Sequence, residues 1–318
     1  MNWNLTTEPR PYQTKATDWA LTRRQVVCCL PTGVGKTLVA VLWLKHLFET
    51  SEAQKALILE PTRLLVNQTT EYFLQKAGVE CIPVDGRIPK EKRHELWHSA
   101  NLVVATPETA LNDIENVTTD AVVVDECHHT VGQDAFAKVM AILKPEYRLG
   151  LSAFVPARRE QEVTELIGTI RRWSWDDPDI APYVPNWIGE VYEGNLDSDE
   201  QALLKAIRQM PSGSGLNPAL LERYLSRDGS VAVRETLSKK NRLAEAFGDM
   251  LLPMAPDTMH KLDALRDIFN THEPEKAIVF VDRVVIADKV SELFPQMSPV
   301  VFKGKRGKFD QVMALHKS

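Results

Sequence analysis

From residue 25 to about residue 152, short apolar runs alternate with longer stretches in which apolar and polar residues mix. The short runs are hydrophobic at nearly every position, which predicts strands that are buried on both faces of a sheet. The longer stretches carry apolar residues at intervals of three and four, which predicts helices with one buried side. The runs are QVVCCL at 25–30, ALILE at 56–60, LVVAT at 102–106, AVVVDE at 121–126 and YRLGLSA at 147–153.

This alternation predicts the fold class. Helical patterns over 37–48, 63–75, 90–98 and 134–144 separate the five runs. Parallel strands need a long connection, which is usually a helix that covers the sheet. We therefore predict an α/β protein in which residues 1–155 form a domain with a doubly wound parallel sheet.

The alternation stops at about residue 155. The next part of the chain carries helical patterns that are interrupted by the turn-forming PSGSG at 211–215. We expect residues 156–257 to be a mainly helical linker or insertion. The helical patterns lie at 200–210, 218–226 and 233–247.

A second alternation of strand and helix patterns occupies residues 258–318. Apolar runs at 276–281 and 299–303 predict strands. Two strands are too few to close a doubly wound domain, so we expect this part to be the beginning of a second α/β domain that the chain does not complete. The helical patterns here lie at 261–269, 285–294 and 309–317.

The composition restricts the class of protein. The 318 residues are 44% hydrophobic and 25% charged, as expected for a globular chain. No apolar run reaches the roughly 18 residues that span a bilayer, and the N-terminus lacks a secretory signal, so we expect a cytoplasmic protein without a membrane partner. The four cysteines form no C-x-x-C pair, which favours buried reduced thiols over a metal site. The net charge of -5 argues against bulk electrostatic coating of nucleic acid but allows a local basic groove.

A glycine-containing turn follows the first apolar run and precedes the first helix. A strand, a glycine turn and a helix are the context of a phosphate-binding loop, because backbone N–H groups turn towards phosphate oxygens at the positive end of the helix. Lys36 is placed to reach the outer phosphates, and the Thr37 hydroxyl is placed for Mg²⁺. Leu30 stands where the general G-x-x-x-x-G-K-[ST] pattern has its first glycine. The turn consists of Pro31, Thr32, Gly33, Val34, Gly35, Lys36 and Thr37.

Two adjacent carboxylates end the fourth apolar run. Together with a phosphate loop they suggest a division of labour, in which Asp125 holds Mg²⁺ and Glu126 orients or deprotonates an attacking water. The predicted reaction is therefore ATP hydrolysis with Mg²⁺ as cofactor and Lys36, Asp125 and Glu126 as catalytic residues.

These residues resemble the ordered motifs of the superfamily 2 helicases of the DEAD/DEAH type. The phosphate loop matches motif I, and Asp125 to His128 matches motif II in the spelling DECH. The segment from Arg10 to Gln13 resembles the Q motif, which implies that both named residues contact ATP and that Gln13 reads the adenine edge. The resemblance implies a RecA-like first domain, the mainly helical insertion and an incomplete second RecA-like domain.

Three further loops fit the same family. Pro61, Thr62 and Arg63 resemble motif Ia, and Thr106 and Pro107 resemble motif Ib, which implies contact with a nucleic-acid backbone. Each loop also has a structural alternative: Thr-Pro pairs commonly end strands, and Arg63 can cap or solvate a helix. Motif III is represented by Ser152 and Ala153, and the resemblance implies that these two residues and His128 couple hydrolysis to strand movement.

Within superfamily 2 the chain is similar to the archaeal Hef and Fanconi-type translocases and to the RIG-I-like helicases. This similarity implies a nucleic-acid partner, with single- or double-stranded DNA favoured over RNA, and work on branched or duplex substrates. The family's motifs V and VI are expected downstream of residue 318. The sequence therefore supports two hypotheses: an ATP-dependent helicase or translocase, or a truncated, hydrolysis-deficient module whose nucleic-acid binding is gated by nucleotide.

Overall fold

The computed structural model describes residues 2–184, 188–211 and 217–301. The chain divides into two compact units, residues 1–187 and residues 188–318, and each is considered by itself. In the described ranges, no helix has both the length and the apolar character needed to cross a bilayer.

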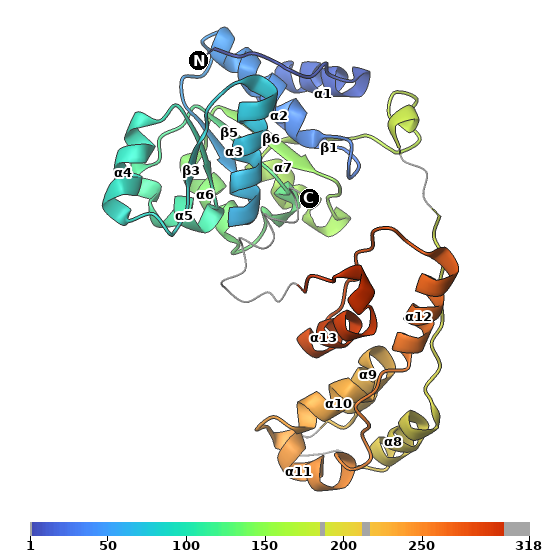
Figure 1. The fold of residues 1–318 in the computed structure, drawn as a ribbon. Helices are drawn as coiled ribbons and strands as arrows, with labels where there is room; N and C mark the ends of the chain where they lie inside the picture. Colours follow the sequence, from blue (N-terminus) through green and yellow to red (C-terminus); the bar gives the residue numbers. More distant parts are fainter. Residues whose placement is uncertain (1, 185–187, 212–216, 302–318) are drawn as a thin grey trace. The chain divides into compact units, whose positions relative to one another are not determined.

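A sheet of seven parallel strands lies at the centre of the first unit (Figure 1). The strand order is β3-β4-β2-β5-β6-β1-β7. All five predicted runs form strands, so the α/β prediction is confirmed, and the sheet is RecA-like. The strands are β1 (Gln25–Cys29), β2 (Ala56–Leu59), β3 (Ile82–Val84), β4 (Leu102–Ala105), β5 (Ala121–Val124), β6 (Tyr147–Ser152) and β7 (Thr169–Arg172).

Two strands at the edges of the sheet were missed from the sequence. The edge strand β3 contains Pro83, which has no N–H to donate and is tolerated at a sheet edge. The other edge strand, β7, pairs with β1 and is largely exposed. Edge strands are not buried on both faces, so they lack the continuous apolar run that identified the central strands.

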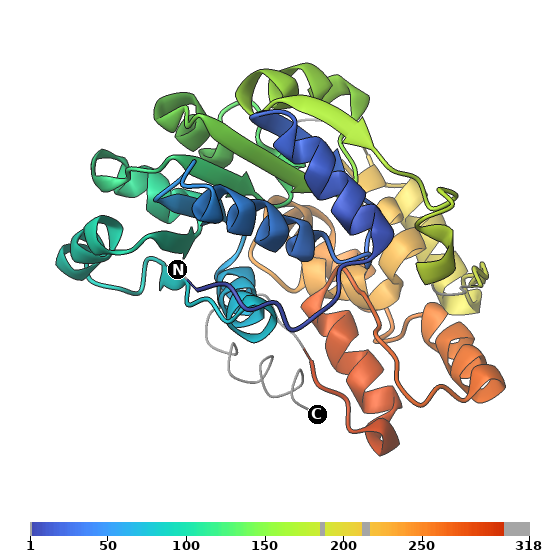
Figure 2. The same cartoon turned by 90° about the horizontal axis from the view of Figure 1, so that it is seen from above.

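Helices cover both faces of the sheet, as Figures 1 and 2 show. On one face, side chains of α1, α2 and α3 form a core that contains Trp43 and Phe73. On the other face, side chains of α4 to α7 form a core that contains Trp97 and Phe136. The helices of this unit are α1 (Pro11–Leu21), α2 (Lys36–Glu49), α3 (Arg63–Ala77), α4 (Lys90–Ser99), α5 (Pro107–Asn112), α6 (Ala135–Leu143) and α7 (Glu160–Leu166), with short 3₁₀ turns at Ile114–Asn116, Cys127–His129, Ala157–Arg159 and Ala181–Tyr183.

The first unit continues beyond residue 155, where we predicted the first domain to end. Helix α7 packs in the same core as α6, and β7 extends the sheet next to β1. The sequence pattern ended too early because α7 has only seven residues and β7 only four, mostly exposed.

The described part of the second unit is helical. Apolar residues of α8, α9, α10 and α11 form a small core of their own. The pattern at 233–247 predicted one helix, whereas α10 ends at Leu237 and α11 begins at Arg242. Asn241 separates them, because its side chain accepts a hydrogen bond from the Ala244 N–H at 2.9 Å and caps α11. The helices are α8 (Ser198–Arg208), α9 (Ala219–Asp228), α10 (Ser230–Leu237), α11 (Arg242–Leu251), α12 (Lys261–His272) and α13 (Val284–Leu293), with a 3₁₀ turn at Pro295–Met297.

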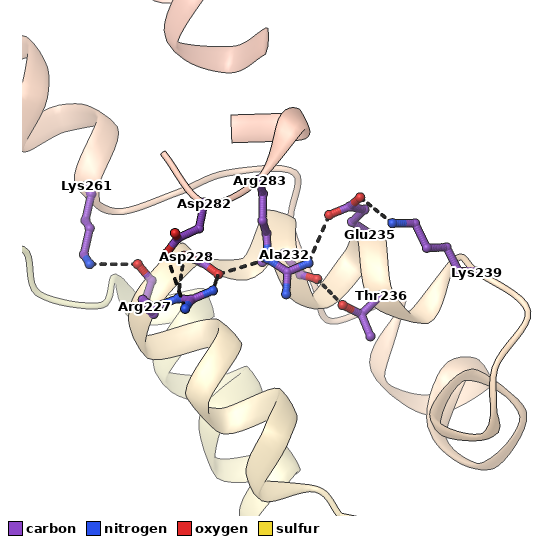
Figure 3. Close-up of polar contacts among 9 residues, drawn as sticks. All are labelled: Arg227, Asp228, Ala232, Glu235, Thr236, Lys239, Lys261, Asp282 and Arg283. Atoms are coloured by element: carbon purple, nitrogen blue, oxygen red, sulfur yellow. Dashed lines mark hydrogen bonds and ion pairs between the residues drawn. The ribbon is translucent and has the colours of Figure 1, made fainter. Parts of the chain in front are cut away.

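An ion-pair network ties the start of α13 to α9 and α10 (Figure 3). Arg283 Nε lies 2.9 Å from Asp228 Oδ2, and Arg283 Nη1 lies 3.1 Å from Glu235 Oε2. Arg227 also pairs with Asp228, at 2.9 Å, and reaches Asp282 at 3.3 Å. The side chains of Asp228 and Arg283 are largely buried, so their ion pair takes the place of the water that would otherwise solvate the two charges.

The strand predicted at 276–281 is not formed. These residues have no ladder partner in the described chain, and Ile278 and Phe280 are 82% and 92% exposed. A strand is stabilised by hydrogen bonds to a neighbour, so an apolar run without a neighbour has no reason to become one. Residues 299–301 are likewise irregular. The rest of that predicted strand and the helix predicted at 309–317 lie outside the described residues.

Candidate nucleotide site

The carboxyl ends of three neighbouring strands bring together three of the predicted motifs. The register aligns Val124 of β5 with Gly150 of β6, and Ser152 of β6 with Cys29 of β1. The phosphate loop follows β1, Asp125 follows β5, and motif III follows β6. Ligands of open α/β sheets bind at this edge, so the chain places the predicted nucleotide residues where a ligand is expected.

The turn from Pro31 to Thr37 has the backbone of a phosphate loop. Gly33 and Gly35 have φ values of 81° and 77°, a left-handed conformation that favours glycine. A Cβ atom on Gly35 would lie 2.8 Å from Gln13 Nε2. Helix α2 begins at Lys36, which places the free N–H groups of its first turn beside the loop.

Residues of the predicted Q motif hold this loop through hydrogen bonds to its carbonyl groups. The Gln13 amide donates to the carbonyls of Val34 and Gly35, both at 3.1 Å, and accepts from the Arg10 N–H at 2.8 Å. The Tyr12 hydroxyl donates to the Val34 carbonyl at 2.6 Å. In this structure Gln13 therefore holds the loop, and its reading of the adenine edge stays a prediction.

The last residue of the phosphate loop and the first carboxylate of motif II lie around one small cavity at the strand ends. Thr37 and Asp125 both line it. Burial, together with the neighbouring Glu126, raises the pKa of Asp125 to about 6, and the Lys36 ammonium opposes this shift. Lys36 directly precedes Thr37 at the start of α2, so it lies next to a residue that lines this cavity together with Asp125. The two halves of the predicted site therefore face a common space.

Glu126 has an unusual backbone. Its φ of 49° and ψ of 45° are left-handed, a conformation that costs a residue with a Cβ on the order of 1 kcal/mol. Its N–H donates to Asp125 Oδ1 at 3.0 Å, so the strained turn orients the preceding carboxylate. Strain of this kind is commonly retained at functional sites.

The structure joins two of the three residues predicted to couple hydrolysis to movement. His128 Nδ1 lies 2.9 Å from Ser152 Oγ and 3.2 Å from Glu126 Oε2. The buried Ser152 hydroxyl donates to the Phe154 carbonyl at 2.9 Å, and its oxygen can accept from His128 in addition to the Phe154 N–H at 3.3 Å. Burial, with the neighbouring His129, lowers the pKa of His128. Ala153 follows Ser152 at the strand end and is half-buried.

Motif Ia combines an exposed surface with a helix cap. The Thr62 hydroxyl accepts from the Leu65 N–H at 3.3 Å and caps α3. Thr62 and Arg63 are exposed, whereas Pro61 is half-buried. The exposed pair is accessible to a nucleic-acid backbone, and that contact stays a prediction.

Motif Ib is less accessible. Thr106 and Pro107 are both buried, and the Thr106 hydroxyl lies 3.0 Å from that of Thr109 at the start of α5. The pair therefore follows the end of β4, in line with the alternative considered above, and its side chains also cap and pack α5. A nucleic-acid contact at this loop would have to use backbone groups.

One acidic residue at this edge was missed from the sequence. Glu60 ends the second apolar run, is 2% exposed, and accepts from the Thr69 hydroxyl at 2.6 Å. Burial, with the nearby Asp125 carboxylate, raises the pKa of Glu60 to about 8. The available signal was a carboxylate at the end of an otherwise apolar strand, directly before motif Ia.

The residues present fit a magnesium-bound triphosphate. The described residues contain no cluster of three His, Cys, Asp or Glu side chains that would hold a metal by themselves. Mg²⁺ usually takes one or two protein ligands and completes its shell with phosphate oxygens and water. Thr37 and Asp125 supply that number, and the loop and Lys36 supply the groups for phosphate.

Comparison with known proteins places this site in a family. The DEAD/DEAH box helicase family matches residues 10–163, which contain the phosphate loop and both carboxylates. The Fanconi anemia group M protein of Gallus gallus is 32% identical over 190 residues, which cover 55% of this chain and 9% of that protein. The ATP-dependent DNA helicase MPH1 of Saccharomyces cerevisiae strain S288c is 28% identical over 160 residues, which cover 46% of this chain and 16% of that protein.

The fold also has a solved counterpart. The crystal structure of the Pyrococcus furiosus Hef helicase domain is similar to this chain, with a TM-score of 0.62 and 20% identity. The match covers 97% of this chain and 83% of the Hef chain. The chain spans a small part of the length of these curated relatives, so the comparisons identify a domain. Residues 10–163 form a DEAD/DEAH box helicase domain of superfamily 2.

Proposed function

We propose that this chain hydrolyses ATP with Mg²⁺ to move on or remodel branched or duplex nucleic acid, with DNA as the favoured polymer. The observation that carries the proposal is the common strand edge, where the phosphate loop, Asp125 and the His128–Ser152 contact lie on adjacent strands. The name of the yeast relative, an ATP-dependent DNA helicase, supports DNA as the polymer.

The phosphate loop and its neighbours bind and orient the nucleotide. The left-handed glycines expose loop N–H groups to phosphate oxygens, and Lys36 neutralises charge on the outer phosphates. Thr37 and Asp125 would hold Mg²⁺, which supplies charge neutralisation on the phosphates when bound. Gln13 and Tyr12 keep the loop in this conformation through the Val34 carbonyl.

Glu126 is positioned to act on the attacking water. Its backbone turns away from the strand direction immediately after Asp125, which separates the two carboxylates into a metal-binding and a water-orienting group. His128 lies between Glu126 and Ser152, so a change at the hydrolytic carboxylate reaches the end of β6 through two contacts. We assign the coupling of hydrolysis to movement to this path, with the exposed Thr62 and Arg63 contacting the polymer backbone.

Steady-state ATP turnover, with and without nucleic acid, tests the proposal. We expect single- or double-stranded DNA to stimulate the rate more than RNA of the same sequence, and Glu126→Gln to abolish the stimulated rate while nucleotide still binds. Stimulation by RNA alone would reassign the polymer. A rate that no polymer changes, together with nucleotide-dependent binding of DNA, would instead favour the hydrolysis-deficient binding module.

A further inference from the structure

Glu60 is a buried acid for which the proposed mechanism has no role. It directly follows β2, whose neighbour in the sheet is β5, and the Asp125 N–H donates to the Leu59 carbonyl at 3.0 Å. This bond places the two residues that follow the adjacent strands side by side. Glu60, Thr37 and Asp125 line the same cavity.

Only half of the Glu60 carboxyl group is satisfied by the protein. Oε1 accepts from Thr69, whereas Oε2 is fully buried and has no hydrogen-bond partner among the described residues. A buried carboxyl oxygen without a partner costs on the order of 1 to 3 kcal/mol, so such groups are usually paired or turned towards a cation. The neighbouring wall of the cavity already carries the hydroxyl and the carboxylate that we assign to Mg²⁺.

The Thr69 contact fixes the direction of this carboxyl group. Thr69 is buried in α3, and α3 packs beside the end of β2 through Phe73 and Val66 in the core. A carboxyl group held at one oxygen by a rigid helix presents its other oxygen at a constant position. Such preorganisation is what outer-shell residues of metal sites provide.

From this arrangement we propose that Glu60 is a positioning residue of the magnesium site, whose free oxygen accepts a hydrogen bond from the water shell of the cation held by Thr37 and Asp125. The inference rests on the proposed function, because it requires a magnesium-bound nucleotide at this edge. Mg²⁺ keeps several of its waters in proteins, so an acceptor beyond the direct ligands has a partner to bind. Glu60 makes no direct bond to metal or nucleotide in this account.

Magnesium titrations of fluorescent ADP binding to the whole chain test the proposal without using turnover. A bound cation favours the ionised carboxylate, so Glu60 is expected to lose its proton when Mg²⁺ binds. In Glu60→Gln, the amide keeps the volume and can still accept from Thr69, but it cannot ionise and therefore never carries a negative charge. We expect the Mg²⁺ concentration for half-maximal ADP binding to rise about 10-fold, in the range found for outer-shell substitutions. Saturating Mg²⁺ is expected to restore wild-type affinity, and binding without Mg²⁺ should be unchanged.

Two further variants keep the test decisive. Glu71→Gln removes the same charge from an exposed position of α3 and should leave the titration at its wild-type midpoint. Thr69→Val keeps the carboxylate but removes its anchor, and it should shift the midpoint in the same direction as Glu60→Gln. A folded Glu60→Gln protein with a wild-type midpoint would overturn the inference, and so would an unchanged midpoint in Thr69→Val if Glu60→Gln does not fold. Failure of the wild-type chain to bind ADP at any Mg²⁺ concentration would instead refute the proposed function.

Discussion

Apolar and charged residues are arranged differently in the two units of this chain. In the first unit, continuous apolar runs lie in a parallel sheet covered on both faces, and the buried Glu60 and the half-buried Asp125 lie together at the carboxyl edge of the sheet. In the second unit, a small helical core is accompanied by the Arg283 network, and the apolar run at 277–281 is exposed. A run becomes a strand where neighbouring strands complete its ladder, and buried charge persists where a ligand or an ion pair compensates it.

The largest effect in the first unit is expected from replacing the predicted catalytic lysine. Lys36→Ala removes the cation beside Asp125, and we expect a loss of turnover on the order of 10³ because the phosphate charge is no longer neutralised. Polymer binding should survive in large part. Lys45→Ala replaces a half-buried lysine of the same helix that pairs with Glu49; it is the matched control and should keep wild-type turnover in the same assay.

The free energy of unfolding of the first unit is expected to depend on pH through its buried acid Glu60. The pKa of Glu60 rises from 4.5 to about 8 on folding, so the folded chain keeps a proton that the unfolded chain loses. The resulting stability is complete below pH 4.5 and is lost as the pH rises through 8, a change on the order of 5 kcal/mol.

Tryptophan fluorescence measures this effect in the first unit alone, because all seven tryptophans precede residue 188. In urea unfolding, Glu60→Gln should reduce the loss of stability between pH 5 and pH 8 relative to wild type. Equal slopes for the two proteins would show that Glu60 is not protonated in the folded state.

Breaking the charge network should affect the second unit only. Arg283→Met removes one of the two arginines that pair with the buried Asp228. We expect the free energy of unfolding to fall by about 2 kcal/mol, less than for a fully buried pair. Helical circular dichroism during urea unfolding should show an earlier transition, while the fluorescence transition stays in place. A shift of both signals together would mean that the two units unfold as one.

The same substitution is expected to have opposite signs in the two units. A Cβ on Gly150 in β6 would lie 2.9 Å from Val27 Cγ2 and 3.0 Å from Cys127 Sγ, so Gly150→Ala should cost about 1 to 2 kcal/mol. Gly248 lies inside α11 with only ordinary contacts, so Gly248→Ala should stabilise by about 0.5 to 1 kcal/mol. The paired fluorescence and dichroism transitions give both values, and destabilisation by Gly248→Ala would contradict the packing described for α11.

Sequence reasoning located the central strands, the phosphate loop and the Asp125–Glu126 pair because each carries a strong local signal. Glu60 escaped it, since nothing local shows that Thr69 and Asp125 converge on that residue. The edge strands β3 and β7 were missed because half-exposed strands have mixed composition. The pattern at 276–281 wrongly predicted a strand, because an apolar run shows the preference of a segment but not whether a partner strand is present.

Calorimetric titration of ADP into the whole chain, with Mg²⁺ and with a chelator, tests most directly whether the Lys36 loop and Asp125 form one magnesium–nucleotide pocket. We predict a single binding event that weakens in the chelator, is lost in Lys36→Ala, and becomes insensitive to Mg²⁺ in Asp125→Asn. The absence of binding heat, or identical titrations for the wild type and both variants, would contradict the account.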